Sequence, residues 1–179
     1  VMHSNKESDG LANCYNNIGT ALDELDECEK SIEYLNKAIE IYEKLYPNKD
    51  NPGLAECYNN IGIYYDDKDR AKAGEYYKKA IEIYEKLYPN KDNEDLADCY
   101  YNIGNALDEC EKSIGYLNKA IEIYENLYPN KDNPSLAECY KNIGIYYDDK
   151  DRAKAIEYYE KANEIYMKSS IRITLVNQD

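Results

Sequence analysis

The chain contains no tryptophan and no phenylalanine, and it has one histidine, His3, among its 179 residues. A Ser-His-Asp or Cys-His catalytic set would depend on this single histidine, which lies in the N-terminal tail. No Cys-x-x-Cys pair, His-x-x-x-His pair or glycine-rich phosphate loop occurs, so neither a zinc site nor a nucleotide site is expected. No stretch approaches the ~20 apolar residues that span a bilayer. These absences argue against an enzyme and against a bound metal, a cofactor or a membrane.

The chain has a large excess of negative charge. It contains 22 lysine and arginine residues and 36 aspartate and glutamate residues, which gives a net charge of -14. A surface that binds nucleic acid needs a basic patch, so DNA and RNA are not expected as partners. The hydrophobic fraction of 43% is too high for a disordered acidic tail. The chain does not open with a basic segment followed by an apolar one, and its six cysteines suggest free thiols, so we expect a cytoplasmic location.

The most informative feature of the chain is an internal repeat. The string AIEIYEKLYPNKDN occupies residues 38–51, recurs unchanged at 80–93, and returns at 120–133 with Asn126 in place of lysine. A second string, Leu-Ala-x-Cys-Tyr-x-Asn-Ile-Gly, begins at positions spaced by 43, 42 and 40 residues, namely Leu11, Leu54, Leu96 and Leu136. Four repeats therefore account for nearly the whole chain, and by sequence the first resembles the third and the second resembles the fourth.

Each repeat reads as two amphipathic helices. In the first repeat, apolar residues spaced by three and four lie on one face of a helix over 11–22 and on one face of a second helix over 32–45. Asn51-Pro52 and Asn133-Pro134 predict helix starts, with asparagine as the N-cap and proline at the first helical position. Asp26 with Glu29, and Asp108 with Glu111, predict capping boxes for second helices. The second helices are expected to end near prolines, at Pro47, Pro89 and Pro129.

Two residue types recur inside the first helices. A glycine in mid-helix costs ~1 kcal/mol relative to alanine, and its presence in all four repeats predicts close contact with the second helix at Gly19, Gly62, Gly104 and Gly144. A cysteine recurs on the apolar face, where we expect buried thiols without metal or disulfide, at Cys14, Cys57, Cys99 and Cys139. The clusters Asp66-Asp67-x-Asp69 and Asp148-Asp149-x-Asp151 lack the glycine and distal glutamate of a calcium loop.

The residues at fixed places in each repeat resemble the tetratricopeptide repeat family. The family pattern of an aromatic residue, a glycine and small residues is filled in the first repeat by Tyr15, Gly19, Leu22, Ser31, Leu35 and Ala38, and the other repeats follow in phase. The usual repeat has ~34 residues, and the longer spacing here is similar to that of kinesin light chains. The resemblance implies an all-α fold, a right-handed α-solenoid of four helix-turn-helix repeats with eight main helices.

The repeat pattern also predicts the division of the chain. The expected segments are a residual inter-repeat loop at 1–10, repeats at 11–53, 54–95, 96–135 and 136–168, and an irregular tail at 169–179. The tail is expected to be irregular because Ile171 to Val176 is rich in β-branched residues.

In tetratricopeptide arrays the exposed side of the first helices lines a concave groove that takes peptides. The resemblance places the following candidates there: Asn13, Asn16, Asn17, Thr20, Asn59, Asn60, Ile63, Tyr101, Asn102, Asn105, Lys141, Asn142 and Ile145. Aspartates and glutamates form the rim, and Lys141 is the only basic residue at these positions. We therefore expect a non-enzymatic protein-interaction scaffold, without a cofactor, whose partner is a basic or neutral peptide or protein rather than an acidic one.

Three alternatives stay open at this point. In the first alternative, the recurrent asparagines form hydrogen bonds with a neighbouring helix instead of a peptide, since an amide both donates and accepts. In the second alternative, near-identical repeats with uncapped ends stack head to tail, and the chain is a self-associating structural array and a homo-oligomer. In the third alternative, the chain is one segment of a longer protein whose activity lies elsewhere.

Overall fold

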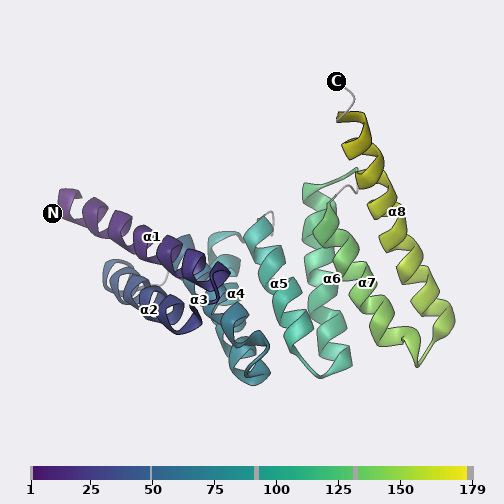
Figure 1. Ribbon diagram of the computed structural model, residues 1–179, viewed down its shortest axis with the longest axis horizontal. Coiled ribbons are helices and arrows are strands. Elements are labelled where there is room, and N and C mark those ends of the chain that lie inside the picture. Colours follow the sequence, from purple (N-terminus) through teal and green to yellow (C-terminus); the bar gives the residue numbers. More distant parts are fainter. Residues whose placement is uncertain (1, 49, 91–92, 131–132, 177–179) are drawn as a thin grey trace. The chain divides into compact units, whose positions relative to one another are not determined.

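The computed structural model describes residues 2–48, 50–90, 93–130 and 133–176, and side chains between residues 8 and 169 within these ranges. Every regular element in this part of the chain is an α-helix (Figure 1). The helices are α1 (Met2–Glu24), α2 (Cys28–Leu45), α3 (Pro52–Asp66), α4 (Arg70–Leu87), α5 (Glu94–Ala106), α6 (Cys110–Leu127), α7 (Pro134–Asp148) and α8 (Arg152–Val176). The chain divides into two compact units, Val1–Asn90 and Lys91–Asp179. Each unit holds two helix pairs, as the sequence predicts, and the all-α class with four helix-turn-helix repeats is confirmed.

The predicted asparagine caps are present at the starts of the first helices. The side-chain oxygen of Asn51 accepts a hydrogen bond from the Leu54 amide at 3.1 Å, and that of Asn133 accepts from the Leu136 amide at 3.1 Å. Each satisfies one of the amide groups that a helix start leaves without a partner. Asn93 caps α5 in the same way, with a distance of 2.8 Å to the Leu96 amide. The inter-repeat loop therefore sets where each of these first helices begins.

The capping boxes predicted for the second helices are wrong. Residues Glu27 and Glu109 hold the N-cap positions of α2 and α6, and neither makes a side-chain cap hydrogen bond. Asp26 instead ends α1, because its φ of 62° is left-handed and its amide bonds to the Asp23 carbonyl. The Glu27 amide reaches the Leu22 carbonyl at 2.9 Å, which completes a Schellman ending of the helix.

The glycines of the first helices lie where the second helices press closest. A Cβ added to Gly62 would lie 2.5 Å from Cε1 of Tyr77, and one added to Gly104 would lie 2.9 Å from Cγ of Leu117. Gly19 faces Leu35 and Gly144 faces Tyr159 in the same manner. Contacts this short are closer than packed side chains tolerate. The close helix crossing predicted from the glycine pattern is therefore confirmed in all four repeats.

Tyrosines fill the core that phenylalanine fills in other proteins, and their hydroxyls tie the repeats of each unit together. The Tyr58 hydroxyl donates to Oε1 of Glu43 at 2.7 Å, and the equivalent Tyr140 hydroxyl donates to Oε1 of Glu125 at 2.8 Å. In each case the donor lies on a first helix and the acceptor on the second helix of the preceding repeat. A buried hydroxyl needs such a partner, so each bond helps to fix how one repeat packs on the next.

Both ends of the chain differ from the prediction. Residues 2–10, expected to be a residual loop, are the beginning of α1, and residues 169–176, expected to be irregular, continue α8 to Val176. Residues 1 and 177–179 of the two expected segments lie outside the described part of the chain. The loop over 45–53 contains Pro47 and Pro52, whereas residues 2–10 contain no proline and nothing after Met167 is proline or glycine. Extending a helix costs far less than starting one, so these segments continue the helices beside them.

The first repeat also departs from the prediction of a buried cysteine. Cys57, Cys99 and Cys139 are buried, but Cys14 is exposed, as are Leu11 and Ile18 on the same side of α1. In the second repeat this side of the helix packs on the preceding repeat, where the Cys57 thiol contacts Oδ1 of Asn16 at 3.3 Å. Leu11, Cys14 and Ile18 therefore form an exposed stripe on α1.

Candidate functional site

The candidate residues lie on α1 and α3 of the first unit and on α5 and α7 of the second. We call the surface they form in each unit the first-helix face. The exposed candidates are Asn13, Asn17, Thr20, Ile63 and Ile145, and the half-buried ones are Asn59, Asn60, Tyr101, Asn102, Asn105, Lys141 and Asn142. Asn16 is the exception, since only 2% of its surface is exposed.

Hydrogen bonds between asparagines join the repeats of the first unit. The amide nitrogen of Asn60 donates to Oδ1 of Asn16 at 3.3 Å and to Oγ1 of Thr20 at 3.2 Å. Asn16 also accepts from the Cys57 thiol. Asn16 therefore differs from the expectation for a peptide-binding residue, because its side chain is enclosed between α1 and α3 and holds them together.

The second unit has a similar connection. The amide nitrogen of Asn142 donates to Oδ1 of Asn105 at 2.8 Å. The ammonium group of Lys141, the one basic candidate, forms an ion pair with Glu138 one turn earlier on α7. The alternative in which recurrent asparagines bond a neighbouring helix therefore holds for Asn60 and Asn142.

Tyrosine hydroxyls from the second helices form hydrogen bonds with side chains at one repeat position of the first helices. The Tyr42 hydroxyl donates to Oδ1 of Asn13 at 2.6 Å, and the Tyr124 hydroxyl donates to Oδ1 of Asp98. Burial raises the pKa of Tyr124, and its bond to Asp98 raises it further. Burial also raises the pKa of Asp98, although the bond from Tyr124 opposes that rise. These tyrosines stay protonated at neutral pH and act as donors, so Asn13 and Asp98 are tied to the core.

The surface that remains for a ligand combines apolar and acidic groups. Ile63 and Ile145 are 46% and 57% exposed at the same repeat position. Asp23 and Glu24 stand at the end of α1, and among the described residues neither is paired with a lysine or arginine. Burial raises the pKa of Asp66, which Arg70 partly offsets, and Oδ1 of Asp66 has no described hydrogen-bond partner. Each first-helix face therefore offers an exposed isoleucine, and in the first unit it lies beside unpaired carboxylates.

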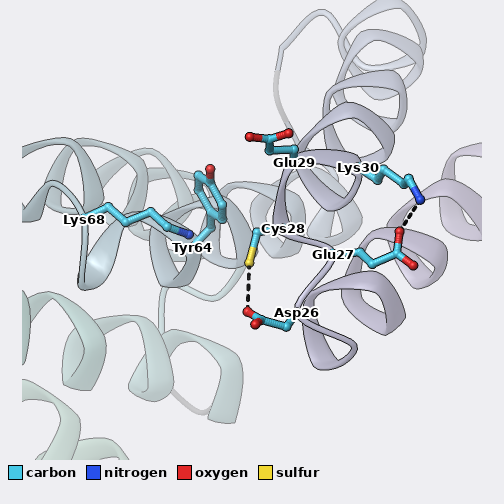
Figure 2. Close-up of a pocket in the computed structure, with 7 residues that line it drawn as sticks. All are labelled: Asp26, Glu27, Cys28, Glu29, Lys30, Tyr64 and Lys68. Carbon is cyan, nitrogen blue, oxygen red and sulfur yellow. Dashed lines mark hydrogen bonds and ion pairs between the residues drawn. The ribbon is translucent and has the colours of Figure 1, made fainter.

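A cavity of the first unit lies between two helix turns (Figure 2). The turn Asp26–Lys30 forms one wall of this cavity of about 450 Å³, and Tyr64 and Lys68 form the other. The Cys28 thiol contacts Oδ1 of Asp26 at 3.6 Å, and Lys68 lies over the Tyr64 ring at 3.7 Å from its centre. Lys30 forms an ion pair with Glu27, and a single cysteine here defines no chemistry.

The acidic turns that precede the second helices act as helix caps. Oδ1 of Asp69 accepts from the Lys72 amide at 3.0 Å, and Oδ1 of Asp151 accepts from the Lys154 amide at 3.1 Å. Across the ranges that the structure describes, histidine, cysteine, aspartate and glutamate form no group suited to hold a metal ion. In the same ranges, no helix combines the length and the apolar character needed to cross a bilayer.

The fold defines a helical repeat protein in which, within each unit, one helix pair packs on the next. The tetratricopeptide repeat model matches residues 12–86, 63–126 and 105–168, which together span most of the chain. The chain belongs to the tetratricopeptide repeat family. No curated protein matches it in sequence.

Several solved structures share this fold. BtubC from P. vanneervenii is 20% identical over 95% of this chain and 66% of its own, with a TM-score of 0.71. MamA is 24% identical over 89% of this chain and 80% of its own, with a TM-score of 0.66. A candidate kinesin light chain from Podosopora anserina, with nearly identical TPR-like repeats, is 15% identical over 89% of this chain and 76% of its own, with a TM-score of 0.62. At these identities the likeness shows the fold alone.

Proposed function

We propose that this tetratricopeptide repeat protein binds a partner protein through an extended segment that is basic or neutral and lies on the first-helix face. The proposal rests chiefly on the exposed Ile63 beside the unpaired carboxylates Asp23 and Glu24. An apolar anchor provides binding energy, while carboxylates attract a cationic partner and disfavour an acidic one. The net charge of -14 strengthens that attraction at long range.

Selection from a displayed library of random linear peptides tests this proposal. Bound peptides are expected to be enriched in lysine and arginine and depleted in aspartate and glutamate, and their affinity should fall as salt is added. The double variant Asp23→Asn with Glu24→Gln should weaken the selected peptides roughly two- to tenfold, because each exposed charge contributes modestly. The charge-matched control Glu40→Gln with Glu75→Gln changes exposed residues of the second helices and should leave the affinity unchanged. Selection of acidic peptides, or of none, would refute the proposal.

Self-association is the second candidate function. Leu11 and Ile18 are exposed on α1, whereas their counterparts Leu54 and Ile61 are buried. An exposed apolar stripe of this kind is typical of surfaces that contact another protein. The opposite end of the array fits such stacking less well, because α8 carries the exposed Asn163 where the other second helices carry Ile39, Ile81 and Ile121. Head-to-tail contact would bury that amide, so we rank this function second.

Light scattering after size exclusion, in reductant and over a wide range of protein concentration, separates the two functions. Self-association predicts a mass that grows with concentration and returns to that of a monomer in the variant Leu11→Asp with Ile18→Asp. Both positions are exposed, so this variant is expected to keep the fold. A monomer at every concentration would eliminate self-association and leave peptide binding unaffected.

A further inference from the structure

A small cavity of about 80 Å³ opens on the first-helix face of the first unit, where α1, α2 and α3 meet. Asp23 and Glu24 of α1 line it together with Ser31 and Leu35 of α2 and Ile63 of α3. Thr20 and Asn60 complete the lining, and the hydrogen bond between them joins α1 to α3 at this point. The cavity has room for a few water molecules or for the tip of one side chain.

The hydroxyl of Ser31 is the unusual group in this cavity. Only 1% of Ser31 is exposed, and its Oγ has no hydrogen-bond partner among the described residues. The carbonyl of Leu22, which holds the repeat position of Leu107 in the third repeat, already accepts two amides at the end of α1, those of Leu25 and Glu27. A buried hydroxyl without a partner is costly, so this serine is suited to a polar group that enters the cavity.

The equivalent serine of the second unit provides a contrast. The Ser113 hydroxyl donates to the Leu107 carbonyl at 2.9 Å. The turn of this repeat is three residues shorter than that of the first repeat, and α5 ends at Ala106. The Leu107 carbonyl is thereby released from the helix and faces the serine. The unpartnered hydroxyl of Ser31 thus results from the longer turn of the first repeat.

The walls of the cavity define what this polar group must be. Leu35 and Ile63 offer apolar surface, and Asp23 and Glu24 place negative charge at the C-terminal end of α1, where the helix dipole is also negative. An occupant must therefore carry an apolar stem and a positively charged tip that donates hydrogen bonds. Lysine has a four-carbon stem and a compact ammonium group with three donors, whereas the planar guanidinium of arginine is broader.

We propose that this cavity is a subsite for one lysine side chain of the bound segment. The stem lies against Leu35 and Ile63, and the ammonium group donates to the Ser31 hydroxyl and to the carboxylates of Asp23 and Glu24. This assignment rests on the proposed peptide binding and names the residue that the first unit selects. The second unit, in which the serine is already bonded, lacks the subsite.

The test uses the whole chain and n-butylammonium, which reproduces the lysine side chain. Titration is followed by the NMR signals of the Leu35, Ile63 and Ile145 methyl groups. Leu35 and Ile63 are expected to shift along one saturable curve in the millimolar range, and Ile145 of the second unit is expected to stay unchanged. Neutral n-butanol should produce no saturable shift, and n-propylguanidinium should bind more weakly than n-butylammonium. Equal shifts at Ile63 and Ile145, or none, would overturn the proposal.

Two serine variants form a matched pair. Ser31→Ala should weaken n-butylammonium binding roughly tenfold, because a hydrogen bond to a charged group is lost, and it should leave the fold as stable as before. Ser113→Ala removes a paired hydroxyl, so it should lower stability and leave the binding unchanged. The reverse pattern, or no difference between the variants, would overturn the proposal.

The peptide library separates this proposal from the function on which it rests. Selected peptides should contain a lysine whose replacement by norleucine or arginine weakens binding to the wild type more than binding to Ser31→Ala, in which the two carboxylates remain. If peptides bind without a preferred lysine, the subsite is wrong and peptide binding stands. If n-butylammonium binds at Ile63 while no peptide is selected, the cavity accepts an ammonium group and the proposed function fails.

Discussion

Replacing Leu136 by alanine is expected to lower the free energy of unfolding by about 2–5 kcal/mol, while the same replacement at Leu11 should change it by less than about 0.5 kcal/mol. The two leucines hold the same position of the repeat. Leu136 is fully buried, so its removal leaves a cavity in the packed interior, whereas Leu11 is exposed on α1. Unfolding in urea, followed by the helical circular dichroism signal, measures the difference.

Leu54→Ala extends this comparison to the first unit, since Leu54 is as buried as Leu136. Its effect should match that of Leu136→Ala rather than that of Leu11→Ala. If Leu11→Ala proved as destabilising as Leu136→Ala, the exposed stripe on α1 would have to be covered in solution, and self-association would gain support over peptide binding.

Gly62→Ala is expected to destabilise the protein by about 1–3 kcal/mol, because the new methyl group overpacks the core against the Tyr77 ring. Helix propensity alone predicts the opposite sign, a gain of about 1 kcal/mol. Tyr77 is itself buried and has little freedom to move away. Chemical or thermal denaturation of the variant gives both sign and magnitude.

Gly115→Ala is the control for this substitution. Gly115 also lies inside a helix, α6, but a Cβ there would meet nothing within 4 Å. It should therefore stabilise the protein by up to about 1 kcal/mol, as propensity predicts. Equal effects at the two glycines would contradict the packing explanation for the glycines of the first helices.

The features that the sequence predicts correctly are those set by short-range patterns. The spacing of apolar residues defines the helix pairs, and Asn51 and Asn133 cap helices because the cap involves only the next three residues. The glycine positions were predictable as well, since a costly residue repeated in every copy signals a constraint on packing. Such patterns are visible in a single chain.

The features that sequence reasoning missed depend on neighbouring segments. Asp26 could equally start α2 or end α1, and only the hydrogen bonds to the α1 carbonyls decide between the two. Asn16 belongs to the row of candidates by its position, but α3 packs over it and encloses it. In the sequence, Ser31 is one of the residues that fill the family pattern. The one signal of its difference from Ser113 was the length of the turn that precedes it.

The asparagine bonds have a consequence for how such an array is inherited. In each unit the donor, Asn60 or Asn142, belongs to the later repeat, and the acceptor, Thr20 or Asn105, belongs to the earlier one. The later repeats carry Ile63 and Ile145 at the acceptor position, and isoleucine accepts no hydrogen bond. A gene duplication that inserted one later-type repeat behind another would copy the donor without its acceptor, whereas a duplication of two repeats would copy one donor together with its acceptor. Natural selection on this gene should therefore favour changes of array length by pairs of repeats.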